Sequence, residues 1–343
     1  TVEQVTPPGL REVSRAVHAE LQRQSVLAMG RTAPNPPVAA LVVGAPAGGD
    51  QLTILASGGT EVAGQRHAEV VALEQLDHHA DLQALGQPEL AQSADIAKAL
   101  RMYVTLEPCS HHGRTPPCTE RILGAIQRHG GPRRLIIFTG DPTLPASGVE
   151  RLRSAGLRVS LPAMPHRANA NAGARAFRAA YLDGFLSRGA GHGPRLHFKA
   201  ALTADGYMGL PDQRVLISNE HALRFGQLLR AKLDASLIGP GTAAIDRPAL
   251  TLRVPDQLPE SAEQIAKHDS PPIASSEERD PLFDAMLRHE REIFTTAREN
   301  LAVYQPQRIF VLVRPFAGAR EYFAVLGDPK SAGGPERPGV HIA

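Results

Sequence analysis

Apolar and polar positions alternate in two different patterns along the first half of the chain. Apolar residues recur at three- and four-residue steps in three segments, which predicts amphipathic helices over residues 11–29, 67–76 and 119–127. Short apolar runs predict buried strands over residues 38–43, 102–106 and 134–139. A polar stretch over residues 77–99 also has helical character. Strands that alternate with helices predict an α/β domain with a largely parallel sheet.

The second half of the chain alternates in the same way. Its pattern predicts a helix over residues 220–232 and strands over residues 196–202, 235–238 and 308–313. Periodicity weakens over residues 161–194, where we expect a connecting segment. The charged, Pro-containing stretch 255–305 is too long for a plain loop in a compact domain, so it predicts an insertion. We therefore expect two domains, over residues 11–160 and 195–343.

Length and composition agree with a two-domain protein that acts on small molecules. The chain has 343 residues, and an ordinary domain has roughly 100–200. The formal net charge is +2 and no run of Lys and Arg resembles the basic stripe that phosphate binding needs, which argues against a nucleic-acid partner. No window approaches the roughly 18 consecutive apolar residues of a membrane span. The composition thus predicts a cytoplasmic protein without a membrane partner.

Four residues together predict a catalytic zinc site. The chain has two cysteines, Cys109 and Cys118, too few for a disulfide framework. With His67 they supply three ligands to Zn²⁺ and leave the fourth tetrahedral position for water. Glu69 follows His67 by two residues, where a carboxylate can carry protons to and from that water. His-x-Glu with a later Pro-Cys and second Cys is typical of zinc deaminases, so we expect ring deamination.

The alternative interpretation is a zinc site that only braces the fold. A single His or Cys is usually a surface or core residue, so each ligand alone is weak evidence. A structural site requires a fourth protein ligand, and His111 or His112 in the loop between the cysteines could supply it. Glu69 argues against this alternative, because a structural site has no use for an acid–base group beside the metal.

Several stretches resemble one known family. The string TLEPCSHHGRTPPC, in which eight residues separate Cys109 from Cys118, is similar to the signature of the bifunctional riboflavin-biosynthesis family, a pyrimidine deaminase fused to a uracil reductase. The stretches APNPPVAALVV, RHAE and TGDP resemble further segments of that family. The resemblance implies a cytidine-deaminase-like three-layer domain followed by a dihydrofolate-reductase-like α/β domain.

The resemblance also implies roles for residues of the first domain. The substrate would be 2,5-diamino-6-ribosylamino-4(3H)-pyrimidinone 5′-phosphate, which would lose its ring amine. His67, Cys109 and Cys118 would hold zinc, and Glu69 would shuttle protons. Asn35 would contact the ring, although Asn before Pro also favours a turn, so a purely structural role for it stays open.

From Leu196 onwards the chain resembles the family's NADPH-dependent reductase domain, through the stretches LHFKAALTADG and GPGTAAIDRPALTLR. The resemblance implies cofactor contacts at Ala201, Leu216, Thr242 and Asp246, with Leu216 where the family usually has Trp. The sequence reaches Ala343 without the family's glycine-rich loop for the NADPH pyrophosphate, and it starts at Thr1 rather than Met. We therefore expect a second domain that is truncated at its C-terminus and binds NADPH weakly.

The same resemblance implies substrate contacts in the second domain, at Lys199, Arg230, Leu250 and Arg253. Two Arg side chains can grip a phosphate group with paired hydrogen bonds, which suits a phosphorylated substrate. Lys199 would lie near the reacting ribose, where a buried Lys can donate a proton. Without the family context these residues would be ordinary surface charges.

Three further alternatives remain open. The first is a deaminase of a different nucleobase, which the long loop between Cys109 and Cys118 and the reductase-like half oppose. The second is a deaminase whose reductase half has degenerated, and the third is a zinc-binding scaffold that has kept the fold without the chemistry. By resemblance we also expect a homo-oligomer.

Overall fold

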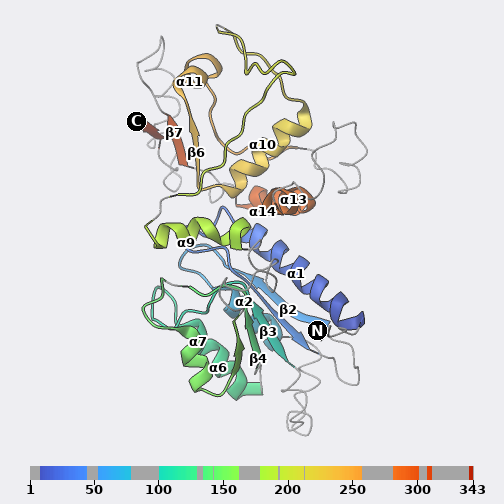
Figure 1. Ribbon diagram of the computed structural model, residues 1–343, viewed down its shortest axis with the longest axis vertical. Helices are drawn as coiled ribbons and strands as arrows, with labels where there is room; N and C mark the ends of the chain where they lie inside the picture. Colours follow the sequence, from blue (N-terminus) through green and yellow to red (C-terminus); the bar gives the residue numbers. More distant parts are fainter. Residues whose placement is uncertain are drawn as a thin grey trace, which may run out of the picture. The chain divides into compact units, whose positions relative to one another are not determined.

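Figure 1 shows the computed structural model of the 343-residue chain. The structure describes residues 8–44, 53–78, 100–129, 134–141, 143–161, 178–191, 194–211, 213–256, 281–300, 307–310 and 340–342. The chain divides into two compact units with the main boundary between Arg195 and Leu196. Residues Met29–Arg31 belong with the second unit and residues 280–285 with the first. Most of the helix predicted over residues 77–99 lies outside the described residues.

The first unit is built on a five-stranded sheet in the order β2-β1-β3-β4-β5. Its strands are β1 (Ala39–Gly44), β2 (Thr53–Gly59), β3 (Arg101–Val104), β4 (Arg134–Ile137) and β5 (Arg158–Ser160). Strand β1 pairs antiparallel with both β2 and β3, whereas β3, β4 and β5 are parallel. The prediction of a largely parallel sheet was therefore wrong, because β2 returns antiparallel beside β1 with no helix between them among the described residues.

Helices cover both faces of this sheet. They are α1 (Pro8–Ala28), α2 (Ala68–Asp77), α6 (Cys118–His129) and α7 (Gly148–Ser154). Successive residues of a strand point to opposite faces. A side chain at Gly58 would meet Ala68 and Val71 of α2, whereas one at Gly59 would meet the backbone of α1. Helices α1 and α2 therefore lie on opposite sides of the sheet, which explains why every residue of β1 is buried.

Three predicted helices are confirmed, over residues 11–29, 67–76 and 119–127. Three predicted strands are confirmed as well, over residues 38–43, 102–106 and 134–139. The observed ends of these elements differ from the predicted ends by a few residues. Strands β2 and β5 and helix α7 were not predicted. Strand β2 has the sequence TILASGG, whose glycines weaken the apolar pattern of a strand. The glycines are present because α2 and α1 approach this strand too closely for larger side chains.

The predicted connecting segment 161–194 is helical over residues 178–189. Residues Arg178–Leu182 form a single π-helical turn, η1, which continues into α9 (Asp183–Gly189). In α9, the Arg188 guanidinium lies 5.8 Å from the centre of the Phe185 ring and donates a hydrogen bond to the carbonyl of Pro34. The boundaries proposed for the two domains and the connecting segment stay predictions.

The second unit contains a three-stranded parallel sheet in the order β6-β7-β8. Its strands are β6 (Ala235–Ile238), β7 (Gln307–Phe310) and β8 (Val340–Ile342), and its helices include α10 (Glu220–Lys232), α11 (Pro240–Asp246) and α14 (Glu290–Glu299). Helix α13 (Pro281–Arg288) spans residues of both units. The predicted helix over 220–232 and strand over 235–238 are confirmed. Residues 311–313 of the last predicted strand lie outside the described part of the chain.

Two helices occupy the stretch that was expected to be an insertion, residues 255–305. Helix α14 packs against α10, and Arg224 of α10 donates a 2.5 Å hydrogen bond to Glu290 of α14. Burial raises the pKa of Glu290, and the positive charge of Arg224 partly offsets this. The stretch therefore contributes the packed helix α14 to the second unit.

The prediction of a strand over residues 196–202 was wrong. Residues 194–219 form no strand among their described positions, and the side chains of Leu196 and Phe198 are 68% and 93% exposed. An apolar run becomes a strand only when a neighbouring strand accepts its backbone hydrogen bonds. None of the described strands pairs with this segment.

None of the helices in the described ranges is both long enough and apolar enough to cross a membrane.

Candidate metal centre

His67 lies at the junction between the loop after β2 and helix α2. Its backbone is extended, with φ −77° and ψ 161°, so His67 occupies the N-cap position of the helix that begins at Ala68. This placement turns the imidazole out of the helix while Glu69 enters the first helical turn. The positive end of the helix dipole lies at that turn and favours a negative charge there.

Cys109 follows β3 at the carboxyl edge of the sheet. Beyond the end of β3, Thr105 still donates its backbone N–H to Ala39, and Glu107 donates to Thr139. The chain therefore stays bonded to its neighbours on both sides until two residues before the cysteine. Such bonding fixes where Cys109 leaves the sheet.

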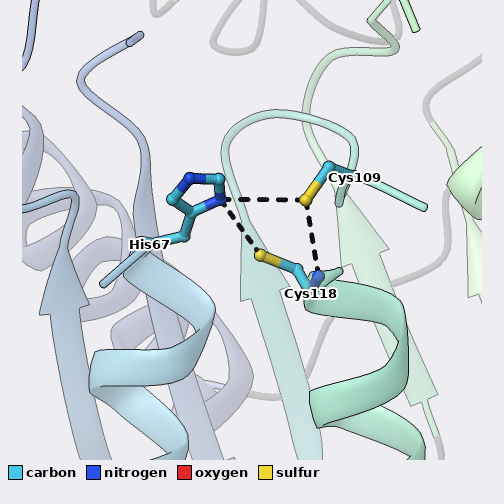
Figure 2. Close-up of side chains that lie close together, drawn as sticks. All are labelled: His67, Cys109 and Cys118. Carbon is cyan, nitrogen blue, oxygen red and sulfur yellow. Dashed lines mark hydrogen bonds between the residues drawn. The ribbon is translucent and has the colours of Figure 1, made fainter. Parts of the chain in front are cut away.

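Cys118 is the first residue of α6 and lies directly beside Cys109. Its backbone N–H donates to the sulfur of Cys109 at 3.4 Å, and the N–H of Thr119 donates to the Cys109 carbonyl at 3.2 Å. Cys109 thus satisfies two of the free N–H groups at the start of α6. Figure 2 shows both sulfur atoms facing the same nitrogen of the His67 ring.

The three side chains fit a tetrahedral zinc ion. His67 Nδ1 lies 3.3 Å from Cys118 Sγ and 3.8 Å from Cys109 Sγ, and all three ligand atoms lie within 4.8 Å of one another. Zn–N and Zn–S bonds of about 2.0–2.1 and 2.3 Å at tetrahedral angles would separate nitrogen from sulfur by about 3.6 Å. The two measured N–S distances lie on either side of that value.

The pKa values of the two cysteines shift in opposite directions. A hydrogen bond from Cys118, together with one from His67, lowers the pKa of Cys109 to about 4. The same contact with Cys109 and the burial of the side chain raise the pKa of Cys118. The hydrogen bond to Cys109 raises the pKa of His67. In the metal-free protein at neutral pH, these opposite shifts favour the thiolate at Cys109 and the thiol at Cys118.

Glu69 is buried beside these ligands and is not one of them. Its side chain is 3% exposed, and it does not belong to the group of residues whose ligand atoms converge. Burial, and after it the negative charge of Cys109, raise the pKa of Glu69 to about 7. A carboxyl with a pKa close to the working pH can both accept and donate a proton.

The fourth ligand that a purely structural zinc site would need does not come from the loop between the cysteines. His111 and His112 are exposed, and neither joins the converging group found among the described residues. Three protein ligands with a buried carboxyl beside them are typical of a catalytic zinc site, in which the fourth position belongs to water.

Two residues that were not among the predicted site residues support the ligands. Thr115 Oγ1 lies 3.5 Å from Nε2 of His67, the ring nitrogen that faces away from the sulfurs. Glu107 accepts hydrogen bonds from the Ser147 hydroxyl at 2.8 Å and from the backbone N–H groups of Val149 and Asp141 at 3.0 and 3.3 Å. Both lie in the TLEPCSHHGRTPPC string, but their partners are visible only in the folded chain.

Asn35 lies in a tight turn of the first unit. Its backbone N–H donates to the carbonyl of Thr32 at 2.8 Å, and its side chain is half-buried. This turn agrees with the structural interpretation of Asn35. Contact with a ring stays a prediction.

In the second unit, the structure brings together part of the predicted substrate site. The backbone N–H of Arg253 donates to the side chain of Gln227 on α10, one helical turn from Arg230. Burial, and after it the positive charge of Arg253, lower the pKa of Arg230. Leu250 is 6% exposed and has a positive φ of 55°. Because the charge of Arg253 affects the pKa of Arg230, the guanidinium groups of these two residues are close enough to interact.

The other predicted reductase residues are spread over the second unit. Thr242 and Asp246 lie on α11, and Thr242 is exposed. Lys199 and Ala201 lie in the irregular segment 194–219, and Leu216 of the same segment is 65% exposed. Their contacts with a cofactor or substrate stay predictions.

The fold and the site together define a class: a mixed α/β protein with a candidate His–Cys–Cys metal centre. The family model described as the RibD C-terminal domain matches residues 194–316. The chain is 32% identical over 227 residues to riboflavin biosynthesis protein RibD of Aquifex aeolicus, a match that covers 65% of this chain. It is 33% identical over 251 residues, or 71% of this chain, to RibD of Mycobacterium tuberculosis. The chain belongs to the RibD family of riboflavin biosynthesis proteins.

The comparisons also show how much of these proteins the chain represents. The matches span 53% of the Aquifex aeolicus protein and 63% of the Mycobacterium tuberculosis protein. The crystal structure of a diaminohydroxyphosphoribosylaminopyrimidine deaminase/5-amino-6-(5-phosphoribosylamino)uracil reductase from Thermotoga maritima is similar with a TM-score of 0.55 and 21% identity. That match covers 96% of this chain and 70% of the other. At this identity the likeness shows a shared fold.

Proposed function

We propose that the first unit is a zinc-dependent deaminase of an aminopyrimidine. The observation that carries this proposal is the buried carboxyl of Glu69 beside the converging His67, Cys109 and Cys118. A zinc ion held by these three residues would supply Lewis acidity, which lowers the pKa of a bound water to about 7. The fold proposed for this unit is cytidine-deaminase-like, with residues 11–160 as its domain.

Glu69 would carry the protons of the reaction. Hydrolytic deamination replaces a ring amine with an oxygen from water and releases ammonia, so one proton must leave the water and the leaving amine must gain one. Glu69 would take the first proton and deliver it to a ring nitrogen. It would then take the second proton from the added hydroxyl and pass it to the amine, so that the carbon–oxygen double bond forms as the carbon–nitrogen bond breaks. The low exposure of its carboxyl excludes bulk water from competing with the substrate for these protons.

The proposed substrate is 2,5-diamino-6-ribosylamino-4(3H)-pyrimidinone 5′-phosphate, which follows from membership of the RibD family. Asn35 would contact its ring. The long loop between Cys109 and Cys118, which matches the family string, distinguishes this proposal from deamination of another nucleobase. A cytoplasmic location and a homo-oligomeric state stay predictions.

For the second unit we propose a dihydrofolate-reductase-like domain that reduces the ribosyl side chain with NADPH. The proximity of Arg230 and Arg253 supports a site for the substrate phosphate, with Leu250 and Lys199 beside the sugar. The proposed cofactor contacts are Ala201, Leu216, Thr242 and Asp246. Single-turnover oxidation of NADPH with the deaminated substrate tests this half separately.

The deaminase proposal is tested by replacing Glu69→Gln. The variant should bind the same amount of zinc as the unmodified protein, about one ion per chain, and should release ammonia at a rate lower by about 10²–10⁴-fold. Glu120→Gln, on the exposed side of α6, is the control and should leave both quantities unchanged. Unchanged ammonia release by Glu69→Gln would refute the proton-carrying role of Glu69. An unmodified protein that binds zinc but releases no ammonia would leave only a zinc-binding role, and an unmodified protein without zinc would exclude both.

A further inference from the structure

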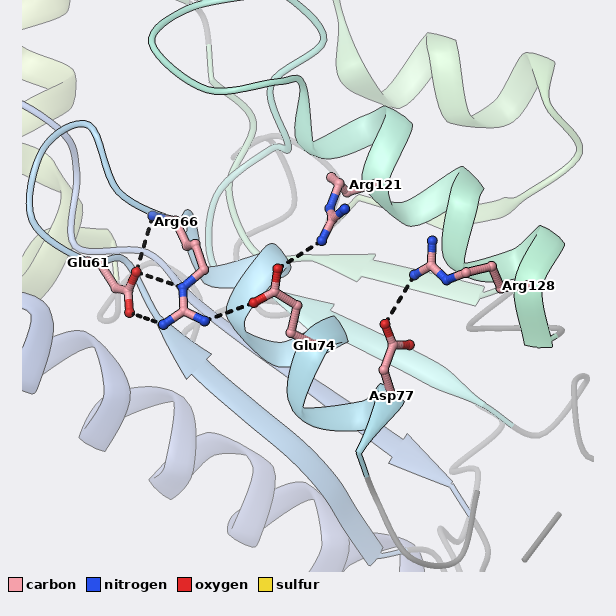
Figure 3. A network of polar contacts seen from close by, with 6 residues as sticks. All are labelled: Glu61, Arg66, Glu74, Asp77, Arg121 and Arg128. Carbon is pink, nitrogen blue, oxygen red and sulfur yellow. Dashed lines mark hydrogen bonds and ion pairs between the residues drawn. The ribbon is translucent and has the colours of Figure 1, made fainter. Parts of the chain in front are cut away.

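A network of ion pairs joins the two helices that begin at the metal ligands. Arg66 holds Glu61 through two side-chain hydrogen bonds of 2.8 and 2.6 Å, and it reaches Glu74 of α2 at 2.8 Å. The second oxygen of Glu74 accepts a hydrogen bond of 2.9 Å from Arg121 of α6. Glu74 is therefore shared between two guanidinium groups, as Figure 3 shows.

The position of this network relative to the ligands is specific. Arg66 directly precedes His67, and Arg121 follows Cys118 by three residues, less than one helical turn. Glu74 lies two turns along the helix that His67 caps. The network therefore connects the chain on the histidine side of the centre to the chain on the cysteine side.

A second ion pair between the same helices lies farther from the centre. Asp77, the last residue of α2, accepts a hydrogen bond of 3.2 Å from Arg128, near the end of α6. It is partly exposed, like the first network, and it links the same two helices. Neither Asp77 nor Arg128 is close to a ligand in the sequence, which makes this pair a natural comparison.

Metal binding is sensitive to the relative position of these helices. Ligand atoms must lie within about 0.5 Å of a productive geometry, and residues that only orient the ligands commonly change metal affinity about 10–100-fold. His67 and Cys118 are 51 residues apart in the chain, so their separation depends on how α2 packs against α6. A single exposed ion pair contributes little, but a carboxylate shared by two guanidinium groups restricts the geometry more strongly.

We propose that Glu74, with Arg66 and Arg121, is a positioning device that keeps His67 and Cys118 at the separation required by the metal. This inference rests on the proposed metal centre and assigns no contact between the three residues and the substrate. The chemistry of the network is electrostatic, so its effect should weaken when salt screens the charges.

Zinc affinity of the full chain, measured by competition with a chromogenic chelator, tests the inference. Glu74→Gln should lower the affinity about 3–10-fold at low salt, below the usual range for orienting residues because these side chains are partly exposed. Asp77→Asn, the matched control between the same helices, should change it less than about twofold. At about 1 M salt, where the screening length is about 3 Å, the difference between Glu74→Gln and the unmodified protein should largely disappear.

A double-mutant cycle separates positioning from general destabilisation. Glu74→Gln, Arg121→Gln and the double variant should show losses of zinc affinity that do not add, because either single change breaks the same contact. Additive losses, or equal losses in Glu74→Gln and Asp77→Asn, would overturn the inference. If Glu74→Gln does not fold, the zinc affinities of Arg121→Gln and Arg128→Gln provide the same comparison between the network and the control ion pair. Absence of zinc binding in the unmodified protein would instead refute the proposed metal centre.

Discussion

Nδ1 of His67 lies 3.3 Å from Sγ of Cys118, although 51 residues separate them in the chain. Both residues stand at the start of a helix, His67 before α2 and Cys118 at the first position of α6. The two helices pack against each other, so their N-termini meet beside the end of β3. The centre is therefore a product of helix packing, and the predictions below concern the contacts that maintain it.

Zinc binding should release a proton and weaken in acid. The pKa of Cys118 is raised in the metal-free protein, so its thiol must lose a proton before the sulfur can bind zinc. The affinity should fall as the pH is lowered, and a pH indicator in weak buffer should report proton release on zinc addition. Cys118→Ser should weaken binding by more than about 100-fold, more than loss of an orienting residue. Zinc affinity that stays constant between pH 8 and 6 would contradict this assignment.

Removal of the Glu69 carboxyl should stabilise the metal-free protein at neutral pH. Burial raises the pKa of Glu69 in the folded protein to about 7, whereas the pKa of an unperturbed carboxyl is 4.5. The folded state thus binds more protons between these values, so the contribution of Glu69 to stability is fully present below pH 4.5 and is lost as the pH rises through about 7. Glu69→Gln should remove this loss.

The expected gain is at most about 3 kcal/mol above pH 7 and vanishes near pH 4. Chemical unfolding of both proteins in the presence of a chelator, at several pH values, measures it. A gain of equal size at all pH values would show that the buried carboxyl is not the cause. A less stable Glu69→Gln at pH 8 would contradict the raised pKa.

A methyl group at Gly58 should push α2 away from the sheet. A Cβ atom there would lie 2.8 Å from the carbonyl oxygen of Ala68 and 2.7 Å from Cβ of Val71. Such contacts cannot be relieved by a flexible side chain, so Gly58→Ala should destabilise the protein by about 1–3 kcal/mol. It should also weaken zinc binding, because α2 carries His67. Gly124→Ala on α6 is the control, since its nearest contact is the end of the Arg128 side chain at 3.4 Å. Equal stability of both variants would contradict this prediction.

Glu107 should be required for the stability of the segment that carries Cys109. Its carboxylate accepts hydrogen bonds from the Ser147 hydroxyl and from the backbone of Val149 and Asp141. Glu107→Gln retains the shape but turns an NH₂ group towards donors, so we expect a loss of about 1–3 kcal/mol. Glu150→Gln, whose contact with Arg153 is on the surface, should cost less than about 0.5 kcal/mol. Urea unfolding of both variants decides between these outcomes.

The sequence was sufficient to select the three side chains that converge in the structure and the main helices around them. His67 and Glu69 lie on one helical start, and Cys109 and Cys118 lie in one string, so local spacing carries their chemistry. Helices α1, α2 and α6 also followed from spacing, because the apolar face of an amphipathic helix is a local pattern. These features depend on residues that are near one another in the chain.

The pairing of strands and the support of the site were decided by tertiary structure. The apolar run 196–202 predicted a strand, but a strand requires a partner, and none of the described strands provides one. Strand β2 was missed because its glycines serve the packing of helices on both faces, which a local pattern does not contain. Glu74 and Arg121 are ordinary helix-surface residues in the sequence, and only the packing of α2 on α6 brings their charges together. Each of these outcomes depends on partners that are distant in the sequence, and local periodicity carries no information about them.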